Sequence, residues 1–343
     1  MVRWQHTHGR HHLPWQASRD PYRVWLSEVM LQQTQVTTVV DYYARFLARF
    51  PDVQALAAAP LDDVLALWSG LGYYSRARNL HRCAQAVVAD HGGSFPRSSA
   101  LLATLPGIGR STAAAIAAFC FGARAAILDG NVKRVLTRAI GFGGDLAVAS
   151  EERALWHAAE ALLPEQELGR YTQGLMDLGA TVCLARRPLC LLCPLVDDCV
   201  AQREGAPQNY PVKTRKLKRG RRAHALLWLV HGNRLWLTQR PASGVWASLW
   251  SLPEFDDLPA LQALLAGWPG SGEVLPTIAH ALTHFDWTLQ PLRWTLPAVA
   301  DTSAFAALLP PGRWVTRGDA LAMGLPAPLR KLLVAEAAAA STG

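Results

Sequence analysis

The sequence predicts a multidomain protein, with an all-α domain over residues 1–202 and a mixed α/β domain over residues 223–343. Two kinds of hydrophobic periodicity support this prediction. Apolar residues recur at helical spacing in the first part, whereas short apolar stretches bounded by turn residues mark the second. Residues 203–222 lie between them, contain eight basic residues and one acidic residue, and include two prolines, which indicates a linker.

The composition fits this division. Two domains are expected for 343 residues, at roughly 150 residues each. No apolar run approaches the roughly 20 residues that span a bilayer, and the N-terminus lacks the apolar core of a secretory signal, so we expect a cytoplasmic protein with no membrane partner. Most of the net charge of +8 lies in the linker. The linker either contacts a DNA backbone or is a solvated strap, and the sequence leaves both open.

Helical spacing from Trp25 to Leu47 is interrupted by the polar run 32–35, which predicts two helices. One or two short helices are expected between Leu56 and Trp68. The glycine at position 122 is a natural helix stop. Further helices are expected at Leu80–Val88, Thr112–Phe121, Val132–Ile140 and Glu151–Leu163.

The second part begins with a predicted β-hairpin. The strands Ala225–Val230 and Leu235–Thr238 flank a turn at residues 231–233. Further strands are expected at Ile278–Leu282 and Trp287–Trp294, and helices at Leu258–Gly267 and Ala327–Ala339.

A glycine-containing turn between two helical stretches is the first candidate functional motif. Leu105-Pro106-Gly107-Ile108-Gly109 precedes an alanine-rich helix, and Leu128-Asp129-Gly130-Asn131-Val132 follows it. Gly107 and Gly109 allow close backbone approach, and the following helix offers free N–H groups to a phosphate. The combination resembles the helix–hairpin–helix DNA glycosylase superfamily. That resemblance implies that Asp129 lies in an active site; by itself, Asp129 could simply cap a helix.

The segment Trp25-Leu26-Ser27-Glu28-Val29-Met30-Leu31-Gln32-Gln33-Thr34-Gln35-Val36 resembles the adenine-specific MutY branch of that superfamily. The resemblance implies that Glu28 protonates adenine at N7, that Asp129 stabilises the sugar cation and that Asn131 supports the site by hydrogen bonding. Apolar neighbours would raise the pKa of Glu28, as a general acid requires. Whether Asp129 acts as an electrostatic group or as a nucleophile stays open.

Ser111 stands where the bifunctional members of the superfamily have a lysine that forms a Schiff base with the sugar. Without an amine at this position, β-elimination is not expected. The alternative functions are a bifunctional pyrimidine glycosylase and lyase, a nucleotide hydrolase, and a catalytically silent binder of DNA lesions. Glu28 and Asp129 together argue against the silent binder.

The resemblance also implies DNA-contacting residues. Gln33 and Tyr73 match side chains that wedge into the duplex beside 8-oxoguanine, and such stacking accompanies base extrusion. Leu13 and Trp15 match the adenine pocket, although Trp15 could equally be structural. Gly107, Gly109 and Ser111 are expected to meet the DNA backbone at the hairpin.

Four cysteines in the pattern Cys183-x₆-Cys190-x₂-Cys193-x₅-Cys199 form a ligand motif within residues 183–199. Spacing alone allows both zinc and a [4Fe–4S] cluster, because both accept four thiolates. The superfamily uses this spacing for a [4Fe–4S] cluster, so the resemblance implies that cofactor.

Residues 223–343 resemble the Nudix-like domain of the family, through the stretch Gln239–Trp250. The acidic helix that holds Mg²⁺ in Nudix hydrolases is missing after Pro253, where three acidic residues stand in a loop-like context, so recognition of 8-oxoguanine without hydrolysis is expected. Thr283 and His284 match the recognition loop, with Leu282-Thr283 where Phe-Ser is commoner; His284 could also be an ordinary strand residue. The whole resemblance implies a monomeric, monofunctional, nucleoid-associated glycosylase of base excision repair that removes adenine opposite 8-oxoguanine or guanine.

Overall fold

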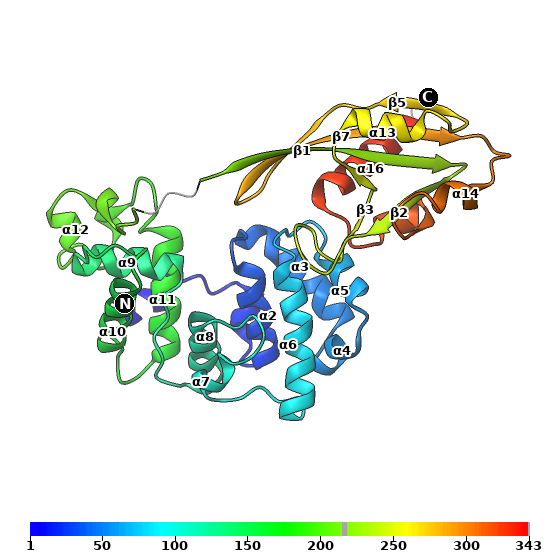
Figure 1. Ribbon diagram of the computed structural model, residues 1–343. Coiled ribbons are helices and arrows are strands. Elements are labelled where there is room, and N and C mark those ends of the chain that lie inside the picture. Colours follow the sequence, from blue (N-terminus) through cyan, green and yellow to red (C-terminus); the bar gives the residue numbers. More distant parts are fainter. Residues whose placement is uncertain (215–217, 342–343) are drawn as a thin grey trace. The chain divides into compact units, whose positions relative to one another are not determined.

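The computed structural model describes residues 1–214 and 218–341, and the chain forms two compact units (Figure 1). The N-terminal unit comprises Met1–Ala58 and Asn79–Lys216, and the C-terminal unit comprises Ala59–Arg78 and Leu217–Gly343. The chain therefore passes from the N-terminal unit to the C-terminal unit for the last time within the predicted linker. Segment 59–78, which the sequence assigns to the all-α domain, makes its contacts with the C-terminal unit.

Every regular element described in the N-terminal unit is helical, which confirms the predicted all-α class. The predicted helices are all present, and α1, α7, α11 and α12 are additional to them. The elements are α1 (Val2–His8), η1 (Pro14–Ala17), α2 (Pro21–Leu31), α3 (Val36–Arg49), α4 (Val53–Ala58), α6 (Ser75–His91, which begins before Asn79), α7 (Ser99–Leu102), α8 (Arg110–Phe121), α9 (Gly130–Ile140), α10 (Ala149–Ala161), α11 (Leu168–Thr181), η2 (Cys190–Leu192), α12 (Val200–Arg203) and η3 (Pro207–Asn209).

Local sequence explains where helix α2 begins and ends. The Asp20 side chain accepts a hydrogen bond from Tyr22 N at 3.0 Å, and Pro21 occupies the first helical position. The helix ends at the predicted polar run, where Gln33 takes a left-handed conformation with φ of 57°. This break separates α2 from α3, and it places Glu28 in the last turn but one of α2.

One hydrophobic core of the N-terminal unit forms between α8, α9, α10 and α11. Val132, Val135 and Leu136 lie on one face of α9 and pack with Leu175 and Leu178 of α11. The spacing of three and four residues on α9 is the periodicity that predicted this helix. Because the start of α9 is fixed by this packing, the residues just before it are also held in place.

The predicted glycine turn joins α7 to α8. Gly107 has φ of 75°, and a Cβ atom at this position would lie 2.5 Å from the Cβ of Asn79. Gly109 differs, since its φ is −82° and a Cβ atom there would have no neighbouring atom within 4 Å. Gly109 is the N-cap residue of α8, and its lack of a side chain leaves the helix N-terminus open.

The C-terminal unit is built on one mixed eight-stranded sheet with the strand order β3-β2-β1-β7-β5, in which β4, β6 and β8 pair with β1, β7 and β2. Its centre is the parallel pair β1–β7, in register from Gly220↔Phe285 to His231↔Leu296. The elements are α5 (Leu61–Trp68), β1 (Gly220–His231), β2 (Arg234–Gln239), β3 (Trp250–Ser251), β4 (Glu254–Phe255), α13 (Leu258–Leu265), β5 (Ser271–Val274), β6 (Ile278–Ala281), β7 (Phe285–Leu296), α14 (Thr302–Ala306), β8 (Gly312–Thr316), α15 (Arg317–Leu321) and α16 (Ala327–Ser341).

The mixed α/β prediction is confirmed. The predicted hairpin is β1–β2, joined with Val230 opposite Leu235, and α13 lies along the long strands in Figure 1. Ala225, Leu227 and Leu229 of β1 pack with α13. The intervening Leu226 and Trp228 point to the other face of the sheet and are buried too, so both faces of this part of the strand are covered.

Two sequence assignments in this unit were wrong in detail. Strand β1 begins at Gly220, so the last three residues of segment 203–222 belong to the sheet because they pair with β7. Glu254 lies in strand β4 and Asp257 caps α13, so these two are not loop residues. Residues 215–217 of the predicted linker lie outside the described residues. Among the helices that the structure describes, none is both long and apolar enough to cross a membrane.

Gly107→Ala is expected to destabilise the protein by about 1–3 kcal/mol, because it forces a left-handed conformation and a clash with Asn79. Chemical denaturation measures this change. Gly109→Ala is the matched control, with ordinary φ and open space, and should change the free energy of unfolding little. Equal effects of both substitutions would contradict the turn geometry described here.

Candidate active site

A cavity of about 660 Å³ opens in the N-terminal unit between η1, α2, α9 and α11. Glu28, Asp129 and Asn131 all line it, although they come from parts of the chain about a hundred residues apart. The volume falls in the range of small-molecule sites. The structure therefore brings the two carboxyl groups that the sequence singles out to the wall of one cavity.

Glu28 lies on α2 among buried neighbours, including Ser27 and Val29. Burial raises the pKa of the Glu28 carboxyl to about 8, and the nearby charge of Asp129 acts in the same direction. No hydrogen bond to this carboxyl occurs among the described residues. With nothing to stabilise its charged form, Glu28 holds a proton at neutral pH.

Asp129 has a different environment, because it is the N-cap residue of α9. Its carboxylate accepts a hydrogen bond from Val132 N at 2.7 Å. Burial raises the pKa of Asp129, while the backbone N–H groups of Val132 and Asn131 and the charges of Arg134 and Lys133 oppose that rise. The helix N-terminus also favours an anion here. Asp129 is therefore a helix cap and a cavity residue at once.

The two environments separate the protonation states of the pair. Only Asp129 has hydrogen bonds and nearby cations that oppose the effect of burial, so its surroundings favour a negative charge more than those of Glu28 do. A neutral carboxylic acid beside a carboxylate is the arrangement used to break a glycosidic bond, with an acid for the leaving group and an anion for the sugar cation. The cavity is equipped for that chemistry.

Asn131 occupies the first turn of α9, two residues after Asp129. Its Oδ1 accepts a hydrogen bond from Arg134 Nη2 at 2.8 Å, and Arg134 also donates to the backbone carbonyls of Gly179 and Cys183. A Cβ atom on Gly179 would lie 2.6 Å from the Cβ of Asn131, so α11 approaches Asn131 closely. The side chain of Asn131 is thus held in one orientation at the cavity wall.

Leu13 and Trp15 are both buried and both line the cavity. The ring of Trp15 makes an edge contact with Tyr43 of α3, at a centroid distance of 5.5 Å. Trp15 therefore combines the two roles that the sequence left open. It packs against the helical core on one side and forms an apolar wall of the cavity on the other.

A polar cluster at the cavity wall was not predicted from the sequence. Arg10 Nε donates to Asp177 Oδ1 at 2.7 Å, and Gln173 Nε2 donates to the same oxygen at 2.9 Å. Asp177 is fully buried, whereas Arg10 and Gln173 line the cavity. The available signal was a lone carboxylate on α11 between the buried residues Leu175 and Leu178.

Two glutamines at the cavity carry side-chain atoms without a hydrogen-bond partner in the described part of the chain. They are both amide atoms of Gln16 and the Oε1 atom of Gln5. Buried amide groups are costly when unpaired. A cavity with apolar walls and unpaired amides suits a ligand that is flat, apolar on its faces and polar at its edge, such as a nucleobase.

The hairpin residues lie in the same unit as the cavity. The Ser111 hydroxyl accepts a hydrogen bond from Leu128 N at 3.2 Å, which ties the start of α8 to the residue before Asp129. Gln32 Nε2 lies 3.5 Å from Thr112 Oγ1 and links the end of α2 to α8. The glycine turn is thus connected to both elements that carry the carboxyl groups.

Gln33 and Tyr73 belong to different units. Gln33 is exposed in the N-terminal unit, just after α2, and Tyr73 lies in segment 59–78 of the C-terminal unit. Tyr73 is 48% exposed, and its φ is 47°, which is a strained conformation for an aromatic residue. Tyr74, by contrast, is buried. An exposed ring held in a strained turn points to a functional role, since an ordinary core residue would be covered.

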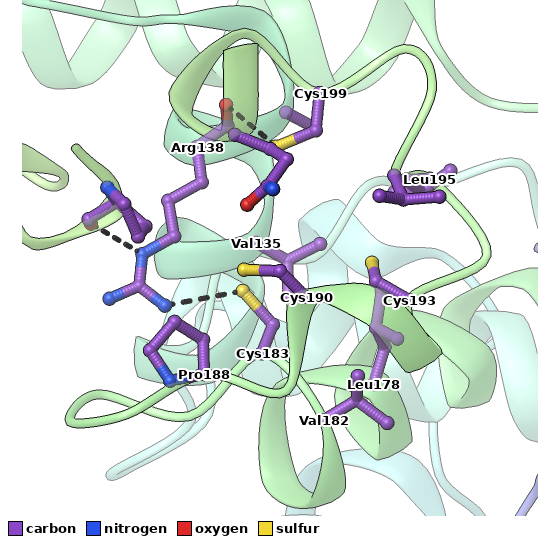
Figure 2. A pocket seen from close by; sticks show the side chains of 14 residues that line it. Val135, Arg138, Leu178, Val182, Cys183, Pro188, Cys190, Cys193, Leu195 and Cys199 are labelled. Atoms are coloured by element: carbon purple, nitrogen blue, oxygen red, sulfur yellow. Dashed lines mark hydrogen bonds between the residues drawn. The ribbon is translucent and has the colours of Figure 1, made fainter. Parts of the chain in front are cut away.

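The four cysteines of the motif line one cavity of about 30 Å³, shown in Figure 2. The buried Arg138 donates to Cys183 Sγ at 3.4 Å, and Cys199 Sγ donates to the Arg138 carbonyl at the same distance. Arg138 also donates to the backbone carbonyls of Leu184 and Pro207. The buried Arg138 guanidinium places a positive charge beside these thiols, as the thiolates of a metal–sulfur site would require.

The side chains present fit a four-thiolate cluster in chemistry. All four are free cysteines, the remaining cavity lining is mostly apolar, and residues of α9 and α11 close it from one side. Within the residues that the structure describes, no three His, Cys, Asp or Glu side chains form a group already suited to a single metal ion. Cys83 is buried and lies outside this cavity.

Thr283 and His284 form the tip of the turn between β6 and β7. Leu282 N donates to Phe285 O across the turn, and Gly220 N donates to His284 O, each at 2.9 Å. Both tip side chains are exposed, so a ligand from outside the unit can reach them. His280 differs, because its ring packs on Trp246 at 5.4 Å, and burial lowers its pKa.

The acidic residues after Pro253 have structural partners. Glu254 pairs with Arg240 at 2.6 Å and lies 3.7 Å from His224, and Asp257 caps α13 through Ala260 N. These carboxylates are separated by their contacts and do not gather on one helix.

Comparison with known proteins agrees with this geometry. Residues 26–160 match the HhH-GPD superfamily of base excision DNA repair proteins, and residues 224–335 match the NUDIX domain. An adenine DNA glycosylase of Buchnera aphidicola is 35% identical over 340 residues, covering 97% of this chain and 95% of its own. The human adenine DNA glycosylase is 34% identical over 374 residues, covering 90% of this chain and 68% of its own.

Among solved structures, a thermostable thymine-DNA glycosylase aligns with a TM-score of 0.54 and 30% identity, over 59% of this chain and 93% of its own. That alignment agrees with the helical fold. The match to adenine DNA glycosylases extends over nearly the whole chain and includes both domains. The chain therefore belongs to the MutY family of adenine DNA glycosylases, enzymes of base excision repair that hydrolyse the N-glycosidic bond of adenine in DNA.

Proposed function

We propose that the enzyme removes adenine mispaired with 8-oxoguanine or guanine, and that it does so without cleaving the DNA strand. The observation that carries the catalytic part is the pair Glu28 and Asp129 on one cavity of about 660 Å³, in environments that favour opposite charge states. An adenine nucleotide extruded from the duplex would enter this cavity.

Glu28 is the general acid. With a pKa of about 8 it carries a proton at neutral pH and donates it to N7 of the adenine. Protonation turns the adenine into a neutral leaving group, so that the bond between base and sugar breaks with both electrons going to the base. The Glu28 carboxylate left behind then accepts a proton from the attacking water.

Asp129 is the anion that stabilises the sugar cation. Its hydrogen bond from Val132 and its position at the start of α9 favour its ionised form and oppose the effect of burial, which raises its pKa. Asn131, fixed by Arg134, supports the sugar or the water by hydrogen bonding. Asp129 acts either through its charge alone or as a nucleophile, in which case one carboxylate oxygen bonds transiently to the sugar. Both roles are compatible with its position.

The remaining cavity walls recognise adenine. Leu13 and Trp15 cover the faces of the base, since both are apolar and line the cavity. Arg10, Gln16 and Gln173 present hydrogen-bonding groups to its edge. These polar groups favour a purine over an apolar molecule, because the nitrogen atoms at the edge of a purine can form hydrogen bonds with them.

Strand cleavage by β-elimination needs an amine that forms a Schiff base with the sugar. Ser111 has a hydroxyl at the corresponding position, and that hydroxyl already accepts a hydrogen bond from Leu128. The product is therefore an abasic site in an intact strand, which breaks only on treatment with alkali.

The opposite base is recognised by the C-terminal unit. The exposed tip residues Thr283 and His284 offer a hydroxyl and an imidazole to the edge of 8-oxoguanine. Gln33 and Tyr73 fill the space left by the extruded adenine, and Gly107, Gly109 and Ser111 bring the start of α8 to a phosphate. The enzyme acts as a monomer on the DNA of the nucleoid.

Cys183, Cys190, Cys193 and Cys199 hold a [4Fe–4S] cluster. When bound, the cluster supplies crosslinks between the ends of a loop that has little regular structure. Arg138 fixes that loop to α9 through its contacts with Cys183, Cys199 and two backbone carbonyls.

Glu28→Gln should abolish adenine release and leave binding to a duplex with adenine opposite 8-oxoguanine largely unchanged, because the amide keeps the size of the side chain and removes the proton donor. Single-turnover release of adenine and a binding titration measure the two effects. Glu165→Gln, at an exposed position outside the cavity, is the control. Substantial turnover by Glu28→Gln would remove Glu28 from its role as the acid.

The single-turnover rate should fall as the pH rises through about 8, by about tenfold for each further pH unit, because Glu28 loses its proton. The same raised pKa makes the free energy of unfolding fall as the pH rises from 4.5 to about 8. Stability is fully present below the ordinary pKa of 4.5 and is lost as the pH rises through about 8. Glu28→Gln should lack this part of the pH dependence of unfolding. A flat rate profile well beyond this pH would be incompatible with the assignment.

Thr283→Ala should reduce the preference for 8-oxoguanine over guanine about fivefold, which is the loss of one typical hydrogen bond. Affinities for the two mispaired duplexes measure the preference. Thr288→Ala, at another exposed threonine of the same unit, should leave it unchanged. The recognition role of Thr283 fails if its variant discriminates between the two bases as well as the parent.

Cys190→Ala should lose iron and sulfide, together with the visible absorption of a thiolate-bound iron cluster. Cys83→Ala, which removes a buried cysteine outside the cavity, should keep both. Elemental analysis of the two purified variants measures the metal content. Zinc in place of iron in the parent protein would overturn the cluster assignment.

A further inference from the structure

The loop that carries Tyr73 is attached to the C-terminal unit by hydrogen bonds to a single backbone carbonyl. Ser69 Oγ donates to Leu325 O at 2.9 Å, and Tyr74 Oη donates to the same oxygen at 3.0 Å. Ser69, Tyr74 and Leu325 are all buried. The two donors stand on either side of the turn 70–73, so one carbonyl fixes both ends of that turn.

Further contacts hold the same loop. The Tyr74 hydroxyl also accepts from Gly70 N at 3.3 Å, and Arg330 of α16 donates to Ser69 Oγ at 3.1 Å. At the far end of the loop, Arg78 Nη1 donates to the Ala247 carbonyl at 2.9 Å. The Tyr74 hydroxyl therefore links the backbone of the turn directly to the backbone of Leu325.

Helix α5, which precedes the loop, packs closely on the same segment. A Cβ atom on Gly324 would lie 2.9 Å from the Cβ of Leu65, so the backbone before Leu325 lies directly against α5. Trp250 Nε1 and Gln239 Nε2 donate to the two carboxylate oxygens of Asp62, each at 3.2 Å. These contacts explain why segment 59–78 belongs to the C-terminal unit.

Although these contacts hold the loop in place, the Tyr73 backbone is strained and its ring is exposed. A φ of 47° costs energy in an aromatic residue and persists only where surrounding contacts determine it. Inside the turn, the Arg76 guanidinium lies 5.6 Å from the centre of the Tyr73 ring and donates to the carbonyls of Leu71 and Gly72. The turn is thus rigid below an exposed ring, as a side chain that enters a base stack needs to be.

We propose that the C-terminal unit positions Tyr73 for insertion into the DNA duplex, through the Leu325 carbonyl and the hydroxyl groups of Ser69 and Tyr74. This inference rests on the proposed wedge function of Tyr73. Ser69 and Tyr74 are positioning residues, since they act through the backbone of the turn and do not touch DNA themselves. The unit that recognises the lesion would then also set the angle of the side chain that replaces the extruded base.

The test uses the full-length protein and a duplex with a non-hydrolysable adenine analogue opposite 8-oxoguanine. A 2-aminopurine placed beside the 8-oxoguanine changes its fluorescence when the stack opens. Tyr74→Phe and Ser69→Ala should each reduce the amplitude of this change, and each should slow single-turnover adenine release on the matching natural duplex by about fivefold, as the loss of one hydrogen bond would. Ser69→Thr, which keeps the hydroxyl, should restore both signals.

Tyr22→Phe is the matched control, because it removes another buried tyrosine hydroxyl that donates to a backbone carbonyl, Phe50 O at 2.7 Å, within the N-terminal unit. It should lower thermal stability to a similar degree without changing the fluorescence amplitude. If Tyr22→Phe and Tyr74→Phe reduce the amplitude equally, the effect is one of stability and the positioning proposal is wrong.

Tyr73→Ala separates this proposal from the wedge function on which it rests. If Tyr73→Ala leaves the fluorescence change intact, Tyr73 does not enter the stack and the wedge function itself fails. If Tyr73→Ala removes the change while Ser69→Ala and Tyr74→Phe preserve it, the wedge function stands and the positioning role is refuted. Loss of the change in Tyr73→Ala and a reduced amplitude in Ser69→Ala and Tyr74→Phe, with rescue by Ser69→Thr, support both.

Discussion

The electrostatic coupling between Glu28 and Asp129 is the constraint on which the active site depends. Both carboxyl groups line one cavity, and burial penalises a negative charge on either. Two charges cannot both be accommodated cheaply at such a site, so the surroundings decide which group keeps the proton. The N-terminus of α9 gives Asp129 hydrogen-bond donors and nearby cations, and α2 gives Glu28 none among the described residues. The proposed acid and the proposed anion of the reaction follow from that difference.

The contacts that set these two charge states also contribute to the stability of the fold. The hydrogen bond from Val132 that favours the ionised form of Asp129 also begins helix α9, and the core between α9 and α11 keeps that helix start in place. A neutral Glu28 is obtained at a cost in stability at and above neutral pH, because the folded state holds its pKa near 8. The strained turn at Tyr73 also lowers the stability of the folded state. Its surrounding contacts maintain a conformation that the isolated segment would avoid.

Much of this could be predicted from the sequence, because the signals are local. Helical periodicity located α8, α9 and α10, two short apolar stretches around a turn located the β1–β2 hairpin, and the segment around Glu28 indicated the enzyme family. Long-range contacts left no comparable signal. Nothing local shows that Asp177 holds Arg10 at the cavity wall, or that Leu325 fixes the loop around Tyr73. The first contact joins residues 167 positions apart and the bond from Ser69 to Leu325 spans 256 positions, so only the packed fold brings these partners together.

The central claim is that Glu28 is a neutral carboxylic acid at physiological pH, and infrared difference spectroscopy between the parent protein and Glu28→Gln observes that proton directly. A carboxylic C=O band present in the parent at neutral pH, absent from the variant and disappearing as the pH passes about 8, is the predicted result. A carboxylate band at neutral pH that titrates near the ordinary value of 4.5 would contradict the account, whatever the activity of the variant.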